Sequence, residues 1–322
     1  MITAYLVEDG RLTARRLAAG ERFPEHAVWI DLQDPDEAER RALAGMLRLP
    51  LPSREHLEEI EASSRAYEEE GVLFLTLHVV AGREGEGAGL TPVGFAVTAD
   101  RLITQRYEDL AAFRLFLARC RPRAEPLPEG ILLGLLETVI DHTADMLERL
   151  GDRVDRVASR VLDAGSGAES GRSYRPLLQE IGRAGDGASR LRECLVSFEL
   201  VLAFLEGRGS RHRAGGLPRE RLDTLARDLR SLADYASFVS GKIGFLLDAV
   251  LGLVGIEQNN IVKIFSVMAL IFMPPTLIAS IYGMNFHFMP ELDWPLGYPL
   301  VLLLMLLSAI LPYRYFRRRG WL

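Results

Sequence analysis

Two uncharged stretches near the C-terminus constrain this 322-residue chain more than any other feature. The 19 residues from Ile264 to Tyr282 carry no charge, and neither do the 20 residues from Trp294 to Tyr313. A hydrocarbon core of about 30 Å takes about 20 helical residues to cross. Two buried helices of a soluble protein are the alternative, but two adjacent runs of this length favour two membrane spans.

The basic residues predict how these spans are oriented. Arg314, Arg317, Arg318 and Arg319 directly follow the second run, whereas the connector at 283–293 has no Lys or Arg. Because cytoplasmic loops are enriched in Lys and Arg, we expect the arginines inside and the connector outside. An even number of spans then returns the first 260 residues to the cytoplasm, so both termini are predicted to be cytoplasmic.

Charge and cysteine usage exclude several classes of protein. The net charge of the chain is −6. Residues 261–322 have a net charge of +3, so residues 1–260 have a net charge of −9. An acidic domain argues against a nucleic-acid binder. Two cysteines cannot build a disulfide framework, and the first thirty residues lack the apolar core of a signal peptide. No His-Glu-x-x-His or Gly-x-Ser-x-Gly motif occurs, so we expect no enzyme.

The first 122 residues predict an α/β domain. Runs of β-branched and aromatic residues predict strands near 2–7, 27–32, 72–80, 92–98 and 101–105. Helical patterns fall near 36–48 and 108–119, and Asp34-Pro35 supplies a start signal for the first. Pro122, Pro126 and Pro128 then mark a boundary.

Three longer helical patterns follow, near 130–163, 174–206 and 218–282. The last contains no proline between Pro218 and Pro274, so it is predicted to run from the cytosol into the membrane. Gly241, Gly244, Gly252 and Gly255 weaken such a helix unless other helices approach closely there. A helix this long cannot bury itself alone, and we therefore expect a symmetric homo-oligomer.

These patterns divide the chain into a cytosolic α/β domain (1–122), a cytosolic helical stalk domain (123–260) and a transmembrane domain (261–322). Within the last, the first span covers about 261–282, an outer loop 283–293, the second span about 294–313 and a basic cytosolic tail 314–322.

One face of the first span carries small and polar side chains. Seven residues follow one another at steps of three and four and so form one stripe on a helix: Asn259, Val262, Ser266, Ala269, Met273, Thr276 and Ser280. Polar groups in lipid are costly unless they face protein or water, so this stripe should face other copies of the chain. Both a helix-packing face and a pore lining fit the pattern.

Residues 55–70 contain seven glutamates in sixteen positions. A solvated acidic helix face is the usual interpretation of such a run. The alternative is a cytosolic site for hard divalent cations, in which Asp223, Asp228 and Asp234 of a neighbouring subunit are candidate partners.

The segment from Ile256 to Pro299 resembles the CorA family of magnesium and cobalt transport channels. The likeness is carried by Tyr282-Gly283-Met284-Asn285 at the end of the first span, by Met289-Pro290-Glu291-Leu292 and by the terminal Trp321-Leu322. It extends upstream through VWIDLQDPD (28–36), LEEIEASSRAYEEEGV (57–72) and LITQRYEDLAAFRLF (102–116), and it is loosest at 160–220.

The resemblance implies a homopentameric funnel in a bacterial cytoplasmic (inner) membrane, with five copies of the first span around a pore for Mg²⁺ and with Co²⁺ and Ni²⁺ as further candidate ions. Gly283, Met284 and Asn285 would form the selectivity filter, and Glu291 and Asp293 would attract cations to the outer mouth. The positions that match pore-facing residues of the family are Asn259, Val262, Phe265, Ala269, Met273, Thr276 and Asn285. Asp248 matches an acidic position near the cytosolic entrance.

The resemblance also implies closure by cytosolic Mg²⁺ bound between subunits, with Glu58, Glu59, Asp223 and Asp228 as candidate ligands. His287 departs from the family, where many members have Glu. Two other functions stay open from the sequence: transport of zinc, as in the related ZntB-like branch, and a non-conducting membrane scaffold or cation sensor. The intact Met-Pro-Glu-Leu loop argues against the zinc branch.

Overall fold

The computed structural model describes residues 1–8, 11–18, 21, 24–59, 61–82, 89–119, 127–165, 174–209, 218–284, 289–290 and 294–321. The chain divides into two compact units, Met1–Leu247 and Asp248–Leu322. One helix, α7 (Arg219–Tyr282), supplies residues to both units. Our finer division into three domains stays a prediction.

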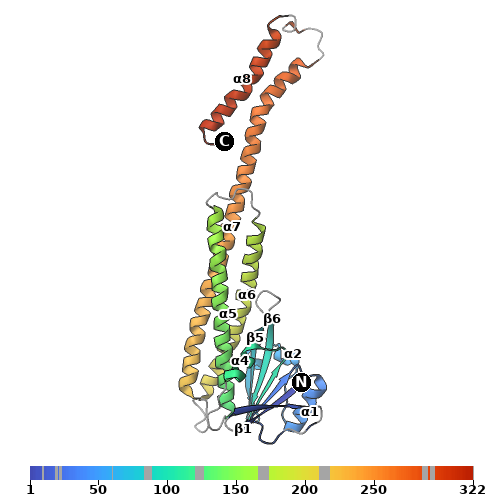
Figure 1. Cartoon of the computed structure of the whole chain (residues 1–322), viewed down its shortest axis with the longest axis vertical. Coiled ribbons are helices and arrows are strands. Elements are labelled where there is room, and N and C mark those ends of the chain that lie inside the picture. The colour runs from blue at the N-terminus through green and yellow to red at the C-terminus, as the bar shows by residue number, and fades with distance from the viewer. Residues whose placement is uncertain are drawn as a thin grey trace. The chain divides into compact units, whose positions relative to one another are not determined.

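Within the described part of the first unit, seven strands form one sheet in the order β2-β1-β3-β7-β6-β5-β4 (Figure 1). Neighbouring strands are antiparallel except β3 and β7, which pair in parallel from Trp29–Leu102 to Gln33–Arg106. The bounds are β1 Ile2–Glu8, β2 Arg11–Leu17, β3 Trp29–Gln33, β4 Ala66–Glu69, β5 Val72–Ala81, β6 Gly89–Val97 and β7 Leu102–Arg106.

Helices cover both faces of this sheet, which explains why β5 is buried along nearly its whole length. On one face, Leu43 of α1 (Glu37–Leu47) shares a core with Ile30 and Leu32 of β3. On the other, the Phe113 ring of α4 (Ala111–Arg119) lies 6.1 Å from that of Trp29. The edge strands β2 and β4 carry charged, exposed residues, which disfavours pairing with another sheet.

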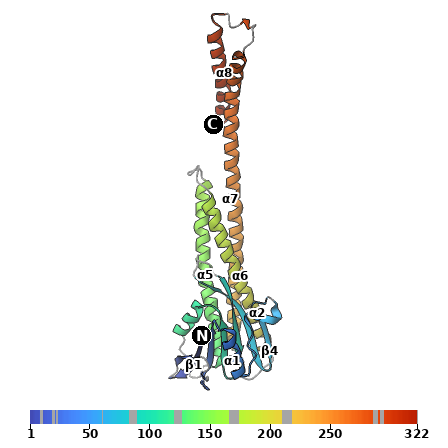
Figure 2. The same cartoon turned by 90° about the vertical axis from the view of Figure 1, so that its right-hand side faces the viewer.

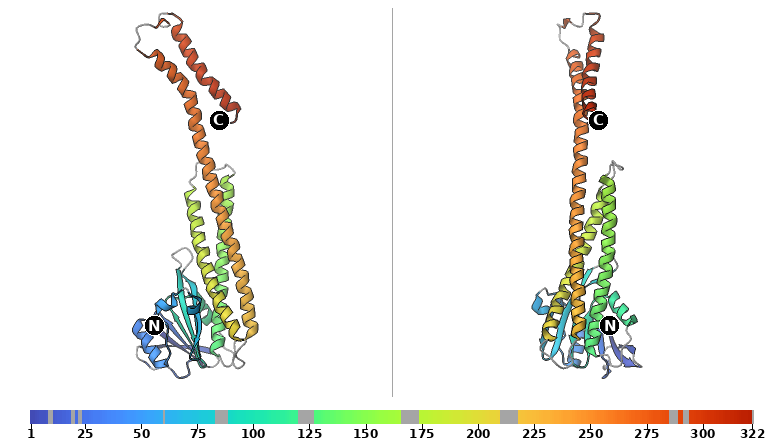
Figure 3. Two further views of the ribbon diagram at one scale, coloured as in Figure 1. Left: turned by 180° about the vertical axis from the view of Figure 1, so that it is seen from behind. Right: turned by 90° about the vertical axis from the view of Figure 1, so that its left-hand side faces the viewer.

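Two long helices, α5 (Pro128–Gly165) and α6 (Arg175–Gly209), stand beside the sheet with the first part of α7 (Figures 1 and 3). Most buried residues of α7 in this unit recur at steps of three, four or seven, which is the spacing of a coiled-coil seam. Arg221 of α7 pairs with Glu137 of α5 at 2.6 Å and Lys242 pairs with Asp155, so α5 and α7 run parallel.

A buried ion pair joins the two parallel strands. The Arg106 guanidinium donates to both carboxylate oxygens of Asp31, at 2.9–3.2 Å, and both side chains are more than 90% buried. The Thr104 hydroxyl donates to Asp31 at 2.6 Å and accepts from the Trp29 indole at 2.9 Å. With these partners the Asp31 charge is satisfied inside the core.

The predicted elements agree with the structure, with three exceptions. Strands β2 and β4 are absent from the prediction, because both are edge strands rich in charged residues. The acidic run at 55–70 is not one helix: it contains α2 (Arg54–Leu57), α3 (Ala62–Arg65) and β4. Glu70 and Gly71, with φ of 49° and 80°, then form the tight turn into β5.

Replacing Arg106 by Met should lower the free energy of unfolding by about 3–5 kcal/mol, because Asp31 would stay buried without its countercharge. Arg101→Met is the matched control. Arg101 pairs with the exposed Asp100, so its loss should cost at most about 1 kcal/mol. Urea denaturation followed by tryptophan fluorescence measures both, and equal costs would contradict the role given to the buried pair.

Candidate ion pathway

In the second unit, α8 (Gly297–Arg318) runs back alongside α7 (Figure 2). Both helices are long and apolar enough to cross a membrane. The less exposed residues of each helix recur at steps of three and four and so mark the faces turned toward each other. They are Val267, Ile271, Pro274 and Ile278 on α7, and Val301, Met305, Ser308, Pro312 and Phe316 on α8.

The predicted stripe lies on the opposite side of α7 from this packed face. Ala269 is about 160° around the helix axis from Val267, which is fully buried. All stripe residues are exposed, as are Phe265 and Asp248, and the exposed fractions of Phe265 and Met273 reach 67% and 66%. Among the described residues, therefore, the stripe lies away from Val267, the one buried residue of this span, and stays open.

Two hydroxyl groups of the stripe are bonded in a way that suits a hydrated cation. Ser266 Oγ donates to the Val262 carbonyl at 2.8 Å, and Thr276 Oγ1 donates to the Phe272 carbonyl at 2.7 Å. Each hydroxyl hydrogen is used within the helix, so each oxygen is left as an acceptor. The waters around a cation point their hydrogens outward, and acceptors are the groups that they need.

Pro274 and Pro275 lie inside α7, which stays helical through them to Tyr282. Neither proline has an N–H to donate, so the carbonyls of Leu270 and Ile271 lose their usual helical partners. In lipid such carbonyls need a hydrogen-bond donor from water or from a neighbouring helix. Both carbonyls lie within one helical turn of Met273, a residue of the stripe.

Gly283 closes the end of α7. Its N–H donates to the Ala279 carbonyl at 2.9 Å, and a Cβ added here would lie 3.0 Å from that same oxygen. A larger residue at this position would therefore crowd the last turn of the helix. Met284 follows and is exposed, whereas Asn285, His287, Glu291 and Asp293 lie outside the described residues.

The cytosolic candidates Glu58 and Glu59 are held by neighbours in sequence. Glu58 accepts from Arg54 Nε at 2.9 Å, and Glu59 lies 3.2 Å from His56 Nδ1. Hydrogen bonds from Ser64 and His56 lower the pKa of Glu59, so its carboxylate stays ionised.

Asp223 and Asp228 have different surroundings on α7, although both are exposed. Asp223 shares a shallow depression with Glu220 and with Arg219, Arg227 and Arg230. Burial is the main cause of the raised pKa of Asp141 on α5; Arg119 opposes the shift, and Asp228 is among the carboxylates that add to it. The described residues contain no group of three His, Cys, Asp or Glu side chains placed to hold a metal ion. Within the described part of one chain, therefore, the four candidates do not form a single site.

Comparison with known proteins assigns this arrangement of helices to a family. The profile of the CorA-like Mg²⁺ transporter protein family matches residues 24–318. The chain belongs to this CorA-like family. It is 38% identical to the magnesium transport protein CorA of Escherichia coli K12 and 36% identical to that of Salmonella typhimurium LT2, and each alignment covers 100% of both chains.

The fold of this CorA-like chain is also that of a solved structure. The complete structure of the CorA magnesium transporter from Methanocaldococcus jannaschii matches with a TM-score of 0.77 over 100% of this chain and 99% of that one, at 22% identity. The α/β domain, the long helix and the two candidate membrane helices of this chain thus match the fold of that full-length structure.

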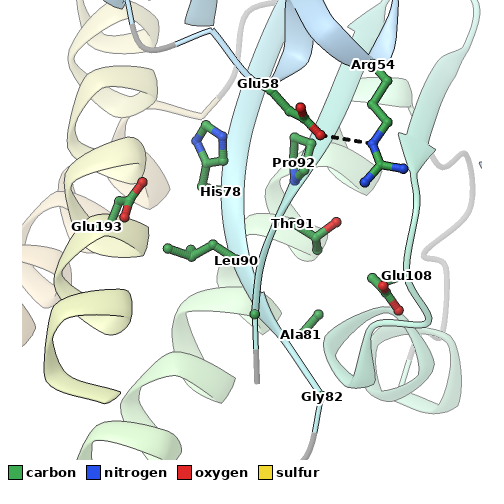
Figure 4. Close-up of a pocket in the computed structure, with 11 residues that line it drawn as sticks. Arg54, Glu58, His78, Ala81, Gly82, Leu90, Thr91, Pro92, Glu108 and Glu193 are labelled. Carbon is green, nitrogen blue, oxygen red and sulfur yellow. Dashed lines mark hydrogen bonds and ion pairs between the residues drawn. The ribbon is translucent and has the colours of Figure 1, made fainter. Parts of the chain in front are cut away.

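One pocket of the CorA-like chain is not predicted by its sequence. A cavity of about 390 Å³ lies beside β5 and β6, with Arg54, Glu58, His78, Glu108 and Glu193 among its lining residues (Figure 4). His78 is 7% exposed, and its Nδ1 has no hydrogen-bond partner. Sequence alone could not reveal it, because the lining comes from segments more than 100 residues apart.

Burial is the main reason why the pKa of His78 lies below 6.5; nearby Arg65 lowers it further, while Glu193 and Glu58 oppose the shift. The unfolded chain therefore binds a proton at a higher pH than the folded chain does. The stability that His78 contributes is complete above about pH 6.5 and is lost as the pH falls below it.

His78→Gln should accordingly lose less stability than the wild type between pH 7.5 and pH 5.5. Urea denaturation followed by Trp29 fluorescence, with Trp294 and Trp321 replaced by Phe, provides the measurement. His26→Gln changes an exposed histidine and is the control. An unchanged pH dependence in His78→Gln would show that His78 does not titrate on unfolding.

Proposed function

We propose that five copies of this chain form a channel that carries Mg²⁺ across the bacterial cytoplasmic (inner) membrane, with Co²⁺ and Ni²⁺ as further ions. The observation that carries the proposal is the open stripe of α7 opposite α8, in a chain of the CorA-like family. Related chains are named magnesium transport proteins, which favours transport over catalysis.

Assembly around α7 is supported by its glycines. A Cβ added at Gly241, Gly244, Gly252 or Gly255 would meet no atom within 4 Å in this chain. Each helical glycine costs up to about 1 kcal/mol relative to alanine, so packing inside one chain does not explain them. Phe238 and Phe245 are also exposed, at 63% and 67%. Close contact between copies of α7 accounts for both features.

In such an assembly Asn285 would select the ion at the outer mouth, next to Gly283 and Met284. Mg²⁺ gives up its water reluctantly. Five neutral amide oxygens can accept hydrogen bonds from a hydrated ion without stripping it, whereas a ring of carboxylates would bind it tightly and slow its release. Glu291 and Asp293 would raise the local cation concentration outside.

Further along the pathway, Phe265 and Met273 would form apolar constrictions that stop conduction when they lose water. Asp248 would attract cations at the cytosolic entrance. The excess of arginine at the end of α8 supports a cytoplasmic position for residues 1–260 and for both termini.

Closure would come from cytosolic Mg²⁺ bound between subunits by Glu58 or Glu59 of one copy and α7 of the next. Of the α7 candidates, Asp228 suits this role better than Asp223, because arginines surround Asp223. Bound Mg²⁺ would favour a closed symmetric state, and its loss would free the subunits to open the pore.

Asn285→Ala should abolish Mg²⁺ entry into liposomes that contain a magnesium-sensitive dye, while native mass spectrometry still finds the pentamer. Asn260→Ala is the control, because Asn260 points toward the α8 side of α7 rather than along the stripe. Normal flux through Asn285→Ala would refute the filter.

The same assay decides between the functions that the sequence leaves open. No flux through wild-type pentamers would favour a scaffold or sensor, and zinc flux that competing Mg²⁺ does not reduce would favour a zinc transporter.

The double variant Glu58→Gln, Glu59→Gln should close less readily, because the coupling between the regulatory site and the pore is lost. The internal Mg²⁺ concentration at which flux is half-inhibited should rise by about fivefold or more. Glu69→Gln with Glu70→Gln removes the same charge from the same acidic run and is the control. If both pairs shift the curve equally, the run acts only as a diffuse negative surface.

A further inference from the structure

A cation–π contact joins α7 to the C-terminal end of the chain. Lys263 Nζ lies 5.2 Å from the centroid of the Trp321 ring. Lys263 is the only basic residue on α7 after Lys242, so it is the only fixed positive charge on the part of the helix that carries the stripe. The partners of this one lysine therefore matter for a pathway that carries cations.

The Trp321 ring is held in place by the end of α8. Gly320 adopts a left-handed backbone with φ of 68°, and the Trp321 N–H donates to the Phe316 carbonyl at 3.1 Å. The Trp321 ring then stacks on the Phe316 ring, with centroids 5.4 Å apart and an interplanar angle of 30°. Phe316 itself is buried. The ring is thus presented to Lys263 by a specific local structure.

Lys263 stands at the border between the two faces of α7. It follows Val262 of the stripe and lies one helical turn beyond Asn259, while Val267 of the packed face lies one turn further on. A lysine side chain has a flexible four-carbon stem, so its ammonium group can reach either the stripe or the α8 side of the helix. The ring of Trp321 holds the ammonium group on the α8 side, away from the stripe.

We propose that Trp321 is a positioning residue for conduction: it keeps the Lys263 charge off the cation pathway. This inference rests on the proposed channel function. Five ammonium groups released toward a common axis would repel an entering or leaving divalent cation, since a ring of charges of the same sign disfavours its passage. Trp321 acts only through Lys263 and does not touch the ion.

Trp321→Leu keeps apolar bulk against Phe316 and removes the aromatic face. A contact of this kind shifts the equilibrium between two positions of a partly exposed lysine side chain by about two- to fivefold. Mg²⁺ flux per pentamer should therefore fall by about that factor. Lys263→Gln should leave flux at or above the wild-type rate. The decisive variant combines the two: Lys263→Gln should restore flux to Trp321→Leu, because the charge that the ring restrains is gone.

A merely structural role of Trp321 predicts a different pattern, since replacing Lys263 cannot repair a loosened α8. Failure of Lys263→Gln to restore flux would overturn the inference, and so would wild-type flux through Trp321→Leu. Trp321→Phe retains a stacked ring if Trp321→Leu does not assemble; its smaller loss should likewise be restored by Lys263→Gln. Absence of flux through the wild-type pentamer would instead refute the channel itself.

Discussion

A helix inside a bilayer has to place its polar side chains against protein or water, because lipid offers them no hydrogen bonds. In this chain Val267 is buried and Ile278 partly buried, whereas Ser266 and Thr276 on the other side of α7 are exposed. Among the described residues, none covers this stripe. The proposed assembly of several copies around an axial pathway rests on this difference between the two sides of α7.

The first unit serves this arrangement by holding α7 in a fixed register. Buried residues of α7 recur with coiled-coil spacing, and Arg221 and Lys242 tie it to α5 at two points well separated along the helix. The sheet supports α5 and α6 in turn, with the Asp31–Arg106 pair fixing the parallel strands at its centre. The proposed closure by bound Mg²⁺ would act on this helix, which continues into the second unit.

Sequence patterns predict most of this fold, because the long helices and central strands have strong periodicity. The helix predicted over 218–282 spans Arg219–Tyr282, and the capping box at Asp36 and Glu39 starts α1 beside the predicted signal. Charged edge strands such as β2 are not predictable in this way, since their residues resemble those of a loop.

Part of the candidate site is likewise predictable from the sequence, and part is not. The stripe on α7 follows from helical spacing alone, and all seven of its residues are exposed in the structure. The His78 pocket and the contact of Lys263 with Trp321 depend on segments that meet only in the folded chain, so no local pattern could predict them. The roles of Asn285 and of the cytosolic carboxylates stay predictions.

Cross-linking of single cysteines tests most directly which face of α7 meets other copies. In a chain with Cys120 and Cys194 replaced, a cysteine at Ala269 is predicted to cross-link copies to one another in membranes. A cysteine at Leu302, which is exposed on α8, should give monomers under the same conditions. Cross-links at Leu302 and none at Ala269 would contradict the account, because α8 rather than the stripe would then face the neighbouring copies.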